Sequence, residues 1–226
     1  MSKGKREISF DTETTGLDPA GGHKLIEIGC VEMINRIPTG KSYHTYIDPK
    51  RDVPEGAFNV HGLSEEFLSG KPEFSDIVDE FLEFVGDARL IIHNARFDMK
   101  FTNHHLAEIG REIIPDSQVF CTLEEARRKF PGSPASLDAL CKRFNIDISA
   151  RDKHGALLDA ELLAAMYLEL MGGSQVALEL GAKGSGGAII SGEQKGEVLE
   201  ARPHAPNAEE LSAHNDFLKK IKEPIW

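Results

Sequence analysis

The sequence predicts a mixed α/β domain followed by a flexible tail. Three apolar segments with short connections come first, which is typical of an antiparallel meander of strands. Helical and strand-like segments alternate after them, which favours a sheet with parallel strands added and helices on its faces. Beyond Gly172 the composition changes to Gly, Ser and polar residues without hydrophobic periodicity, as expected of a flexible segment.

The expected elements follow from the spacing of apolar residues and of turn residues. Gly21-Gly22 separates the first two strands, and residues 35–40 separate the second from the third. Apolar residues repeat at helical spacing between Pro72 and Gly86, so we expect an amphipathic helix packed on the sheet. The expected strands are residues 5–11, 24–34, 41–47, 89–93 and 118–121, and the expected helices are residues 73–85, 95–109, 122–129, 136–144 and 156–171.

Composition places the chain among ordinary globular proteins. Its 226 residues suffice for one well-buried domain with an appendage, and no apolar stretch approaches the roughly 20 residues that span a bilayer. The first six residues lack the apolar stretch of a secretory signal. Cys30, Cys121 and Cys141 are scattered in apolar contexts, so we expect reduced thiols in a cytoplasmic protein.

Two acids lie one residue apart at the end of the first predicted strand. If the strand continues over Ile8–Glu13, its side chains alternate, so Asp11 and Glu13 project from one face and repel each other unless a proton or a cation intervenes. Asp98 opens a later helix, and His154 and Asp159 stand at the start of the last core helix. Each of them alone would more often be a surface group. Together they can form an oxygen-rich site for two hard cations about 3.5–4 Å apart, which suits phosphodiester cleavage.

Four segments resemble the 3′–5′ exonucleases that carry four acids and a histidine, and in particular the proofreading subunits of bacterial replicative polymerases. The resemblance covers about residues 5–171. It implies 3′–5′ exonuclease activity and a ribonuclease-H-like sheet, which fits the predicted order of strands and helices. The matching segments are residues 11–16 (DTETTG), 59–63 (NVHGL), 93–98 (HNARFD) and 154–160 (HGALLDA).

The resemblance also implies a role for each member of the acid cluster. Asp11 would bridge two divalent ions, Mg²⁺ or Mn²⁺, which carboxylate ligands favour over zinc. Glu13 and Asp159 would complete the coordination of the ion that activates water, and Asp98 would support the second ion. His154 would be the general base, because an imidazole with its ordinary pKa of about 6.5 accepts a proton at neutral pH.

Further residues match family positions that hold the terminal nucleotide. One group follows the first acids, and a second lies on the loop before the first long helix. His61 could contact substrate or bond a nearby carbonyl, Asn94 could contact substrate or fix its loop, and Phe97 could stack on a base or pack in the core. The candidate substrate-binding residues are Thr14, Thr15, Leu17, His61, Asn94 and Phe97.

The formal net charge of −11 contrasts with the basic surface of most DNA-binding proteins. The acids of the predicted site account for part of this charge. The rest indicates that the chain alone binds DNA weakly. We therefore expect a partner to hold the substrate and present its single-stranded or frayed 3′ end to the site.

The tail carries two candidate docking segments. Residues 175–180 (QVALEL) resemble the sliding-clamp-binding peptides of bacterial replication proteins, although Leu180 stands where Phe is frequent. An apolar stripe and the terminal Trp226 predict a short helix that docks on the catalytic (alpha) subunit of the polymerase, or alternatively folds back on its own core. The expected organisation is an exonuclease domain over residues 1–173, a linker over residues 174–206 and a docking helix within residues 207–226.

These observations favour a metal-dependent 3′–5′ exodeoxyribonuclease that removes mispaired 3′-terminal nucleotides for a replicative polymerase. One alternative is an exoribonuclease of the same fold, since no residue plainly reads a 2′-hydroxyl. The tail argues against a self-contained ribonuclease. The other alternative is an inactive tether between polymerase and clamp, against which the intact acids and histidine argue.

Overall fold

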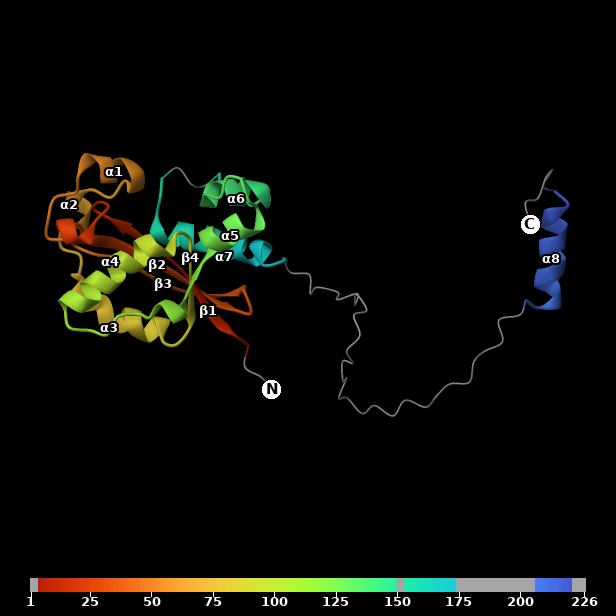
Figure 1. The fold of residues 1–226 in the computed structure, drawn as a ribbon, viewed down its shortest axis with the longest axis horizontal. Coiled ribbons are helices and arrows are strands. Elements are labelled where there is room, and N and C mark those ends of the chain that lie inside the picture. Colours follow the sequence, from red (N-terminus) through yellow and green to blue (C-terminus); the bar gives the residue numbers. More distant parts are fainter. Residues whose placement is uncertain (1–3, 150–152, 174–205, 221–226) are drawn as a thin grey trace, which may run out of the picture. The chain divides into compact units, whose positions relative to one another are not determined.

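The structure is a computed structural model that describes residues 4–149, 153–173 and 206–220 (Figure 1). The chain divides into two units, one with the described residues up to 173 and the other with residues 206–220. The clamp-like segment 175–180 and Trp226 lie outside the described residues. The first unit contains β1 (Arg6–Thr14), β2 (Leu25–Ile34), β3 (Ile37–Tyr46), α1 (Glu55–His61), α2 (Glu65–Leu68), α3 (Phe74–Val85), β4 (Arg89–Ile92), α4 (Ala95–Glu108), β5 (Val119–Cys121), α5 (Thr122–Lys129), α6 (Leu137–Arg143) and α7 (Ala156–Leu170), with short 3₁₀ turns at Pro19–Gly21 and Asp116–Gln118.

The strands form a single mixed sheet in the order β3-β2-β1-β4-β5. β1 pairs antiparallel with β2, and β2 pairs antiparallel with β3, which is the predicted meander. β4 joins β1 in parallel, and β5 joins β4 in parallel. The predicted fold class, a ribonuclease-H-like sheet flanked by helices, is therefore confirmed.

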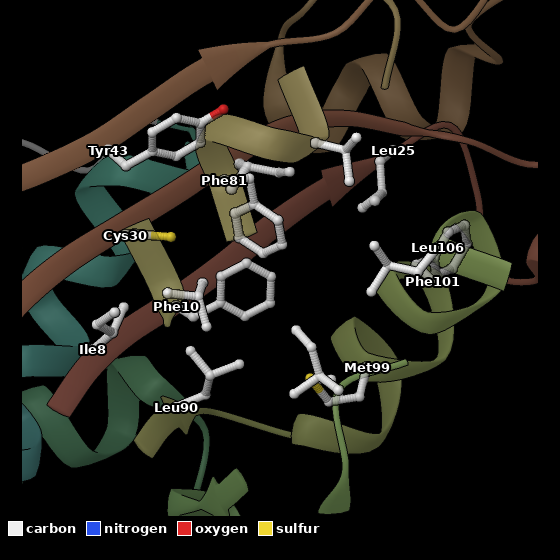
Figure 2. Close-up of a cluster of buried hydrophobic side chains, with 14 of the residues drawn as sticks. Ile8, Phe10, Leu25, Cys30, Tyr43, Phe81, Leu90, Met99, Phe101 and Leu106 are labelled. Carbon is white, nitrogen blue, oxygen red and sulfur yellow. The ribbon is translucent and has the colours of Figure 1, made fainter. Parts of the chain in front are cut away.

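The main hydrophobic core lies between one face of the sheet and helices α3 and α4. Alternate residues of β1, Ile8 and Phe10, are fully buried there. The rings of Phe10 and Phe81 face each other with centroids 5.7 Å apart, and Met99 and Phe101 of α4 close the same cluster (Figure 2). The apolar spacing that predicted the helix over residues 73–85 is thus the face of α3 that packs on the sheet.

Helix α7 covers the opposite face of the sheet, with α5 and α6 packed beside it (Figure 1). Its first turn crosses β2 at Gly29, where an added Cβ would stand 2.2 Å from the carbonyl carbon of Ala156. The buried hydroxyl of Ser9 on β1 donates to the backbone oxygen of Ala160 at 2.7 Å. Only a glycine permits this approach, so Gly29 fixes where α7 begins relative to β1.

Three details of the predicted elements were wrong. The first strand was expected to end at residue 11, but β1 continues to Thr14. The connection predicted over residues 35–40 is only a two-residue turn, because Asn35 and Arg36 both adopt positive φ angles, of 52° and 70°, and β3 already begins at Ile37. The short helices α1 and α2 were missed. As a result His61, predicted on a loop, is the last residue of α1, which ends at Gly62 with a φ of 75°.

The second unit contains α8 (Ala208–Leu218), in agreement with the predicted short helix. The side chain of Asn207 caps it by accepting from the Glu210 N–H, and the Glu210 carboxylate accepts from the Asn207 N–H, which completes a capping box. Leu211 and Phe217 are about half exposed within this unit. The helix is therefore locally specified while its apolar side chains have little cover.

No disulfide joins Cys30, Cys121 and Cys141, the three cysteines of the described part. Within the same residues, every helix is too short or too polar to cross a bilayer.

Replacing Gly29 with Ala should lower the free energy of unfolding by roughly 1–3 kcal/mol, the usual cost of overpacking, because the new methyl meets backbone rather than a movable side chain. Urea titration monitored by circular dichroism would measure the change. Gly56→Ala on α1 is the matched control, since an added Cβ there meets nothing within 4 Å, and it should leave stability unchanged or up to about 1 kcal/mol higher. Equal losses for both variants would contradict the close approach.

Candidate active site

One cavity of about 800 Å³ collects the acids and the histidine singled out in the sequence. Asp11 and Glu13 reach it from the end of β1, and Asp98 reaches it from the first turn of α4. His154 precedes α7, and Asp159 lies in the first turn of that helix. Segments far apart in the sequence therefore meet at the carboxyl ends of the parallel strands β1 and β4.

Glu13, His154 and Asp159 form the tightest group in this cavity. One ligand atom from each lies within 4.8 Å of the others. Glu13 and Asp159 are buried, and Nδ1 of His154 lies 3.1 Å from Oδ2 of Asp159. Buried carboxylates at this separation repel each other, and their oxygen atoms are the ligands that hard divalent cations prefer. The donor set therefore fits a divalent metal ion.

Asp98 accepts a hydrogen bond from Thr12, a residue that was not among the predicted site residues. The hydroxyl of Thr12 donates to Oδ1 of Asp98 at 2.7 Å in a fully buried contact. Burial raises the pKa of Asp98 to about 7, although the hydrogen bond from Thr12 acts in the opposite direction. Thr12 stands between Asp11 and Glu13 and points to the other face of β1. The alternation of the strand was the available signal for its position.

Helix α1 holds the loop that carries His154. The backbone N–H of His154 donates to the carbonyl of Val60 at 3.2 Å. The ammonium group of Lys153 lies 4.8 Å from the centre of the Phe58 ring, within the range of a cation–π contact. The imidazole of His154 is itself half exposed. The loop is thus positioned by its backbone and by Lys153, while the ring reaches water.

The turn after β1 is built by the two threonines predicted to bind substrate. The hydroxyl of Thr14 donates to the carbonyl of Gly16 at 2.6 Å, and the hydroxyl of Thr15 accepts the N–H of Lys24 at 2.9 Å. Both residues line the cavity, but these hydroxyls stabilise the turn. Leu17 is 81 % exposed and projects from the same turn. An exposed apolar side chain at the mouth of the cavity is suited to contact with a base.

Asn94 and Phe97 each line the cavity and also have a structural role, and their contact with substrate stays a prediction. Asn94 has a φ of 66°, a left-handed conformation that asparagine tolerates, so it turns the chain into α4 while lining the cavity. Phe97 packs on Phe101, with ring centroids 5.2 Å apart, and its remaining surface lines the cavity.

His61 is buried and neutral at the side of the cavity. Its Nδ1 accepts the N–H of Leu63 at 3.0 Å, so the predicted alternative of a bond to a carbonyl is not observed. Burial lowers the pKa of His61 to about 4. The neutral ring therefore carries its proton on Nε2, which has no hydrogen-bond partner among the described residues. A buried donor of this kind is costly unless a ligand accepts from it.

Comparisons with known proteins agree with this geometry. The model of the exonuclease family matches residues 8–167. DNA polymerase III subunit epsilon of Rickettsia conorii is 48 % identical over 98 % of both chains, and that of Salmonella typhimurium is 43 % identical over 96 % of this chain and 94 % of the relative. The chain therefore belongs to the exonuclease family, in the branch formed by the epsilon subunits of DNA polymerase III.

Solved structures share the fold. Exonuclease X in complex with 5′-overhanging duplex DNA is 26 % identical, with a TM-score of 0.57, over 74 % of this chain and 90 % of that one. The nuclease domain of 3′hExo bound to rAMP superimposes with a TM-score of 0.64 over 75 % of this chain and 93 % of that one, at 15 % identity, and therefore supports the fold alone.

The pKa of Asp98 predicts how metal-free stability depends on pH. A carboxyl whose pKa is raised to about 7 on folding stabilises the folded state below its ordinary pKa, and this contribution is lost as the pH rises through 7. Asp98→Asn should therefore raise the free energy of unfolding at pH 8 in EDTA by about 2–4 kcal/mol, with a gain that disappears towards pH 4. Urea titrations across this range would measure it.

Asp87→Asn is the matched control for this comparison, since Asp87 is exposed on the connection between α3 and β4. It should change stability little at any pH. A gain for Asp98→Asn that is the same at pH 5 and pH 8 would contradict the burial of a titrating carboxyl.

Proposed function

We propose that the chain is a metal-dependent 3′–5′ exodeoxyribonuclease that removes mispaired 3′-terminal nucleotides as the proofreading subunit of a bacterial replicative polymerase in the cytoplasm. The convergence of Asp11, Glu13, Asp98, His154 and Asp159 on one cavity carries the proposal, together with the similarity to epsilon subunits over nearly the whole chain.

The four carboxylates are proposed to hold two divalent ions, Mg²⁺ or Mn²⁺. Glu13 and Asp159 offer oxygen ligands within 4.8 Å of each other, Asp11 lines the same cavity, and Asp98 would support the second ion. Bound ions of this kind lower the pKa of the attacking water and stabilise the leaving oxygen. The residues around them exclude bulk water and orient the strand: His61 donates from Nε2 to an oxygen of the terminal nucleotide, and Leu17 and Phe97 contact its base.

His154 is proposed as the general base rather than a metal ligand. Hard cations prefer oxygen ligands, and the imidazole is half exposed whereas the side chain of Asp159 is 4 % exposed. With its Nδ1–H donating to Asp159, the ring is oriented to take up a proton at Nε2. Asp159 then both holds metal and orients the base.

His154→Ala should lower turnover roughly 10²–10⁴-fold, the range for loss of a general base, while the Mg²⁺ concentration for half-maximal activity changes little. Steady-state hydrolysis of single-stranded DNA across a Mg²⁺ titration would separate the two effects. A large rise in the Mg²⁺ requirement would instead make His154 a ligand.

A panel of substrates tests the proposed function directly. Hydrolysis should require Mg²⁺ or Mn²⁺ and should be faster on single-stranded and mispaired 3′ ends than on paired ends, because a mispaired end costs less to separate. An RNA of the same sequence tests the exoribonuclease alternative. The double variant Asp11→Ala, Glu13→Ala is the inactive control, and its metal-free melting temperature should be unchanged or higher. Equal rates on paired and mispaired ends would count against proofreading, and faster RNA hydrolysis would favour the alternative.

The tail is proposed to connect the exonuclease with two partners. The clamp-like segment 175–180 would bind the sliding clamp as an extended peptide. The exposed apolar residues of α8, with the terminal Trp226, would dock on the alpha subunit of the polymerase. A tether of this kind would raise the effective concentration of the exonuclease at the primer end.

Deleting residues 207–226 should leave hydrolysis of single-stranded DNA unchanged and abolish co-purification with the polymerase alpha subunit, because the exposed stripe of α8 is removed. Leu211→Ser with Phe217→Ser should weaken the same association without shortening the chain. Tight binding by the truncated protein would locate the contact elsewhere.

A further inference from the structure

A second cavity of about 500 Å³ adjoins the cavity of the acids. His93 and Asn94, at the connection between β4 and α4, line both of them. A strand that leaves the acids past Asn94 would enter this second cavity. Its other lining residues come from α5 and from the segment between α5 and α6, and they are Leu123, Arg127, Ser133, Ala135 and Ser136.

The two cavities differ in charge. Apart from histidines, the ionisable side chains that line the first are carboxylates, and neither Lys nor Arg stands among its described lining residues. The described lining of the second has no carboxylate, and Arg127 is its cationic side chain. A DNA strand carries a negative charge at each phosphate, so the second cavity attracts the backbone that the acids of the first repel.

Arg127 differs from the two basic residues that follow it, because it forms no ion pair. Arg128 pairs with Glu125 at 2.7 Å, and Lys129 pairs with the same carboxylate at 3.6 Å. Arg127 is exposed, and within the described parts of the chain it makes no hydrogen bond or ion pair. Of the three basic residues of α5, Arg127 lines the cavity and is available to a ligand.

The start of α5 is fixed to the same strand end that leads to Asp98. The hydroxyl of Thr122 donates to the carbonyl of Ile92 at 3.3 Å, and Nδ1 of His93 lies 3.0 Å from the same hydroxyl. Leu123 and Arg127 are four residues apart, so they lie on one face of α5. This anchoring holds Arg127 at a set position relative to the acids.

We propose that Arg127 binds a backbone phosphate of the DNA strand on the 5′ side of the scissile phosphate, with Leu123 in contact with the adjoining sugar or base. The assignment rests on the proposed function, whose substrate it extends beyond the terminal nucleotide. Guanidinium forms paired hydrogen bonds with phosphate oxygens, which suits this position better than a point charge. Arg127 is thus a positioning residue that aligns the strand and takes no part in bond cleavage.

The test compares a short oligothymidylate with the p-nitrophenyl ester of thymidine 5′-monophosphate, which has no upstream phosphate. Binding of the fluorescently labelled oligonucleotide is measured with Ca²⁺ in place of Mg²⁺, and hydrolysis of both substrates is measured with Mg²⁺. Arg127→Ala should raise Kd and KM for the oligonucleotide roughly tenfold and leave the ester unchanged. The slope of log Kd against log salt should fall by about 0.7, the value for one single-strand phosphate contact.

Arg128→Ala is the matched control, because it removes the same charge from the adjacent, paired residue, and it should have little effect on either substrate. Arg127→Lys should restore the salt slope and only part of the affinity. Equal effects of the two alanine variants on oligonucleotide binding, or an equal rise in KM for the ester, would overturn the assignment. If Arg127→Ala weakens oligonucleotide binding but the wild-type protein hydrolyses neither substrate, the proposed function alone would be refuted.

Discussion

The approach of α7 to β2 at Gly29 is the constraint on which the site depends. In the β1–β2 ladder Asp11 lies opposite Gly29, so the start of α7 stands beside Asp11. Asp159 follows Ala156 within one turn of that helix, which places its carboxylate within 4.8 Å of Glu13 on β1. The hydrogen bond from Ser9 to the backbone of α7 holds the same contact one turn further on. A side chain at residue 29 would separate the two halves of the acid cluster.

The cavity concentrates negative charge in a way that opposes folding and favours function. Buried Glu13 and Asp159 gain nothing from each other without a cation, and burial alone raises the pKa of Asp98. The sheet and its two layers of apolar side chains supply the stability that such a cluster lacks. The formal charge of −11 fits the proposals that bound cations and Arg127 on α5 assist the approach of a polyanion.

Local patterns predicted most of the fold because they report burial directly. The strands of the meander alternate or run apolar through the sheet, and the predicted helix over residues 73–85 differs from α3 by one residue. The short helix α1 was missed because its seven residues give too little periodicity to distinguish it from a loop. The length of the connection at Asn35 and Arg36 was overestimated, since it was expected to span residues 35–40. In each case the missing information was backbone conformation, which side-chain pattern does not encode.

By itself the sequence determined which residues form the acid cluster and in which order of elements they occur, because strand and helix periods fix the direction of each side chain locally. Only the tertiary structure decided how these residues are held. The Thr12 hydroxyl beneath Asp98, the Val60 carbonyl that holds the His154 backbone, and the neutral His61 with its proton on Nε2 each depend on long-range packing or burial. Packing of α4 on the sheet brings Thr12 and Asp98 together. No local periodicity along the chain predicts a contact between residues so far apart in sequence.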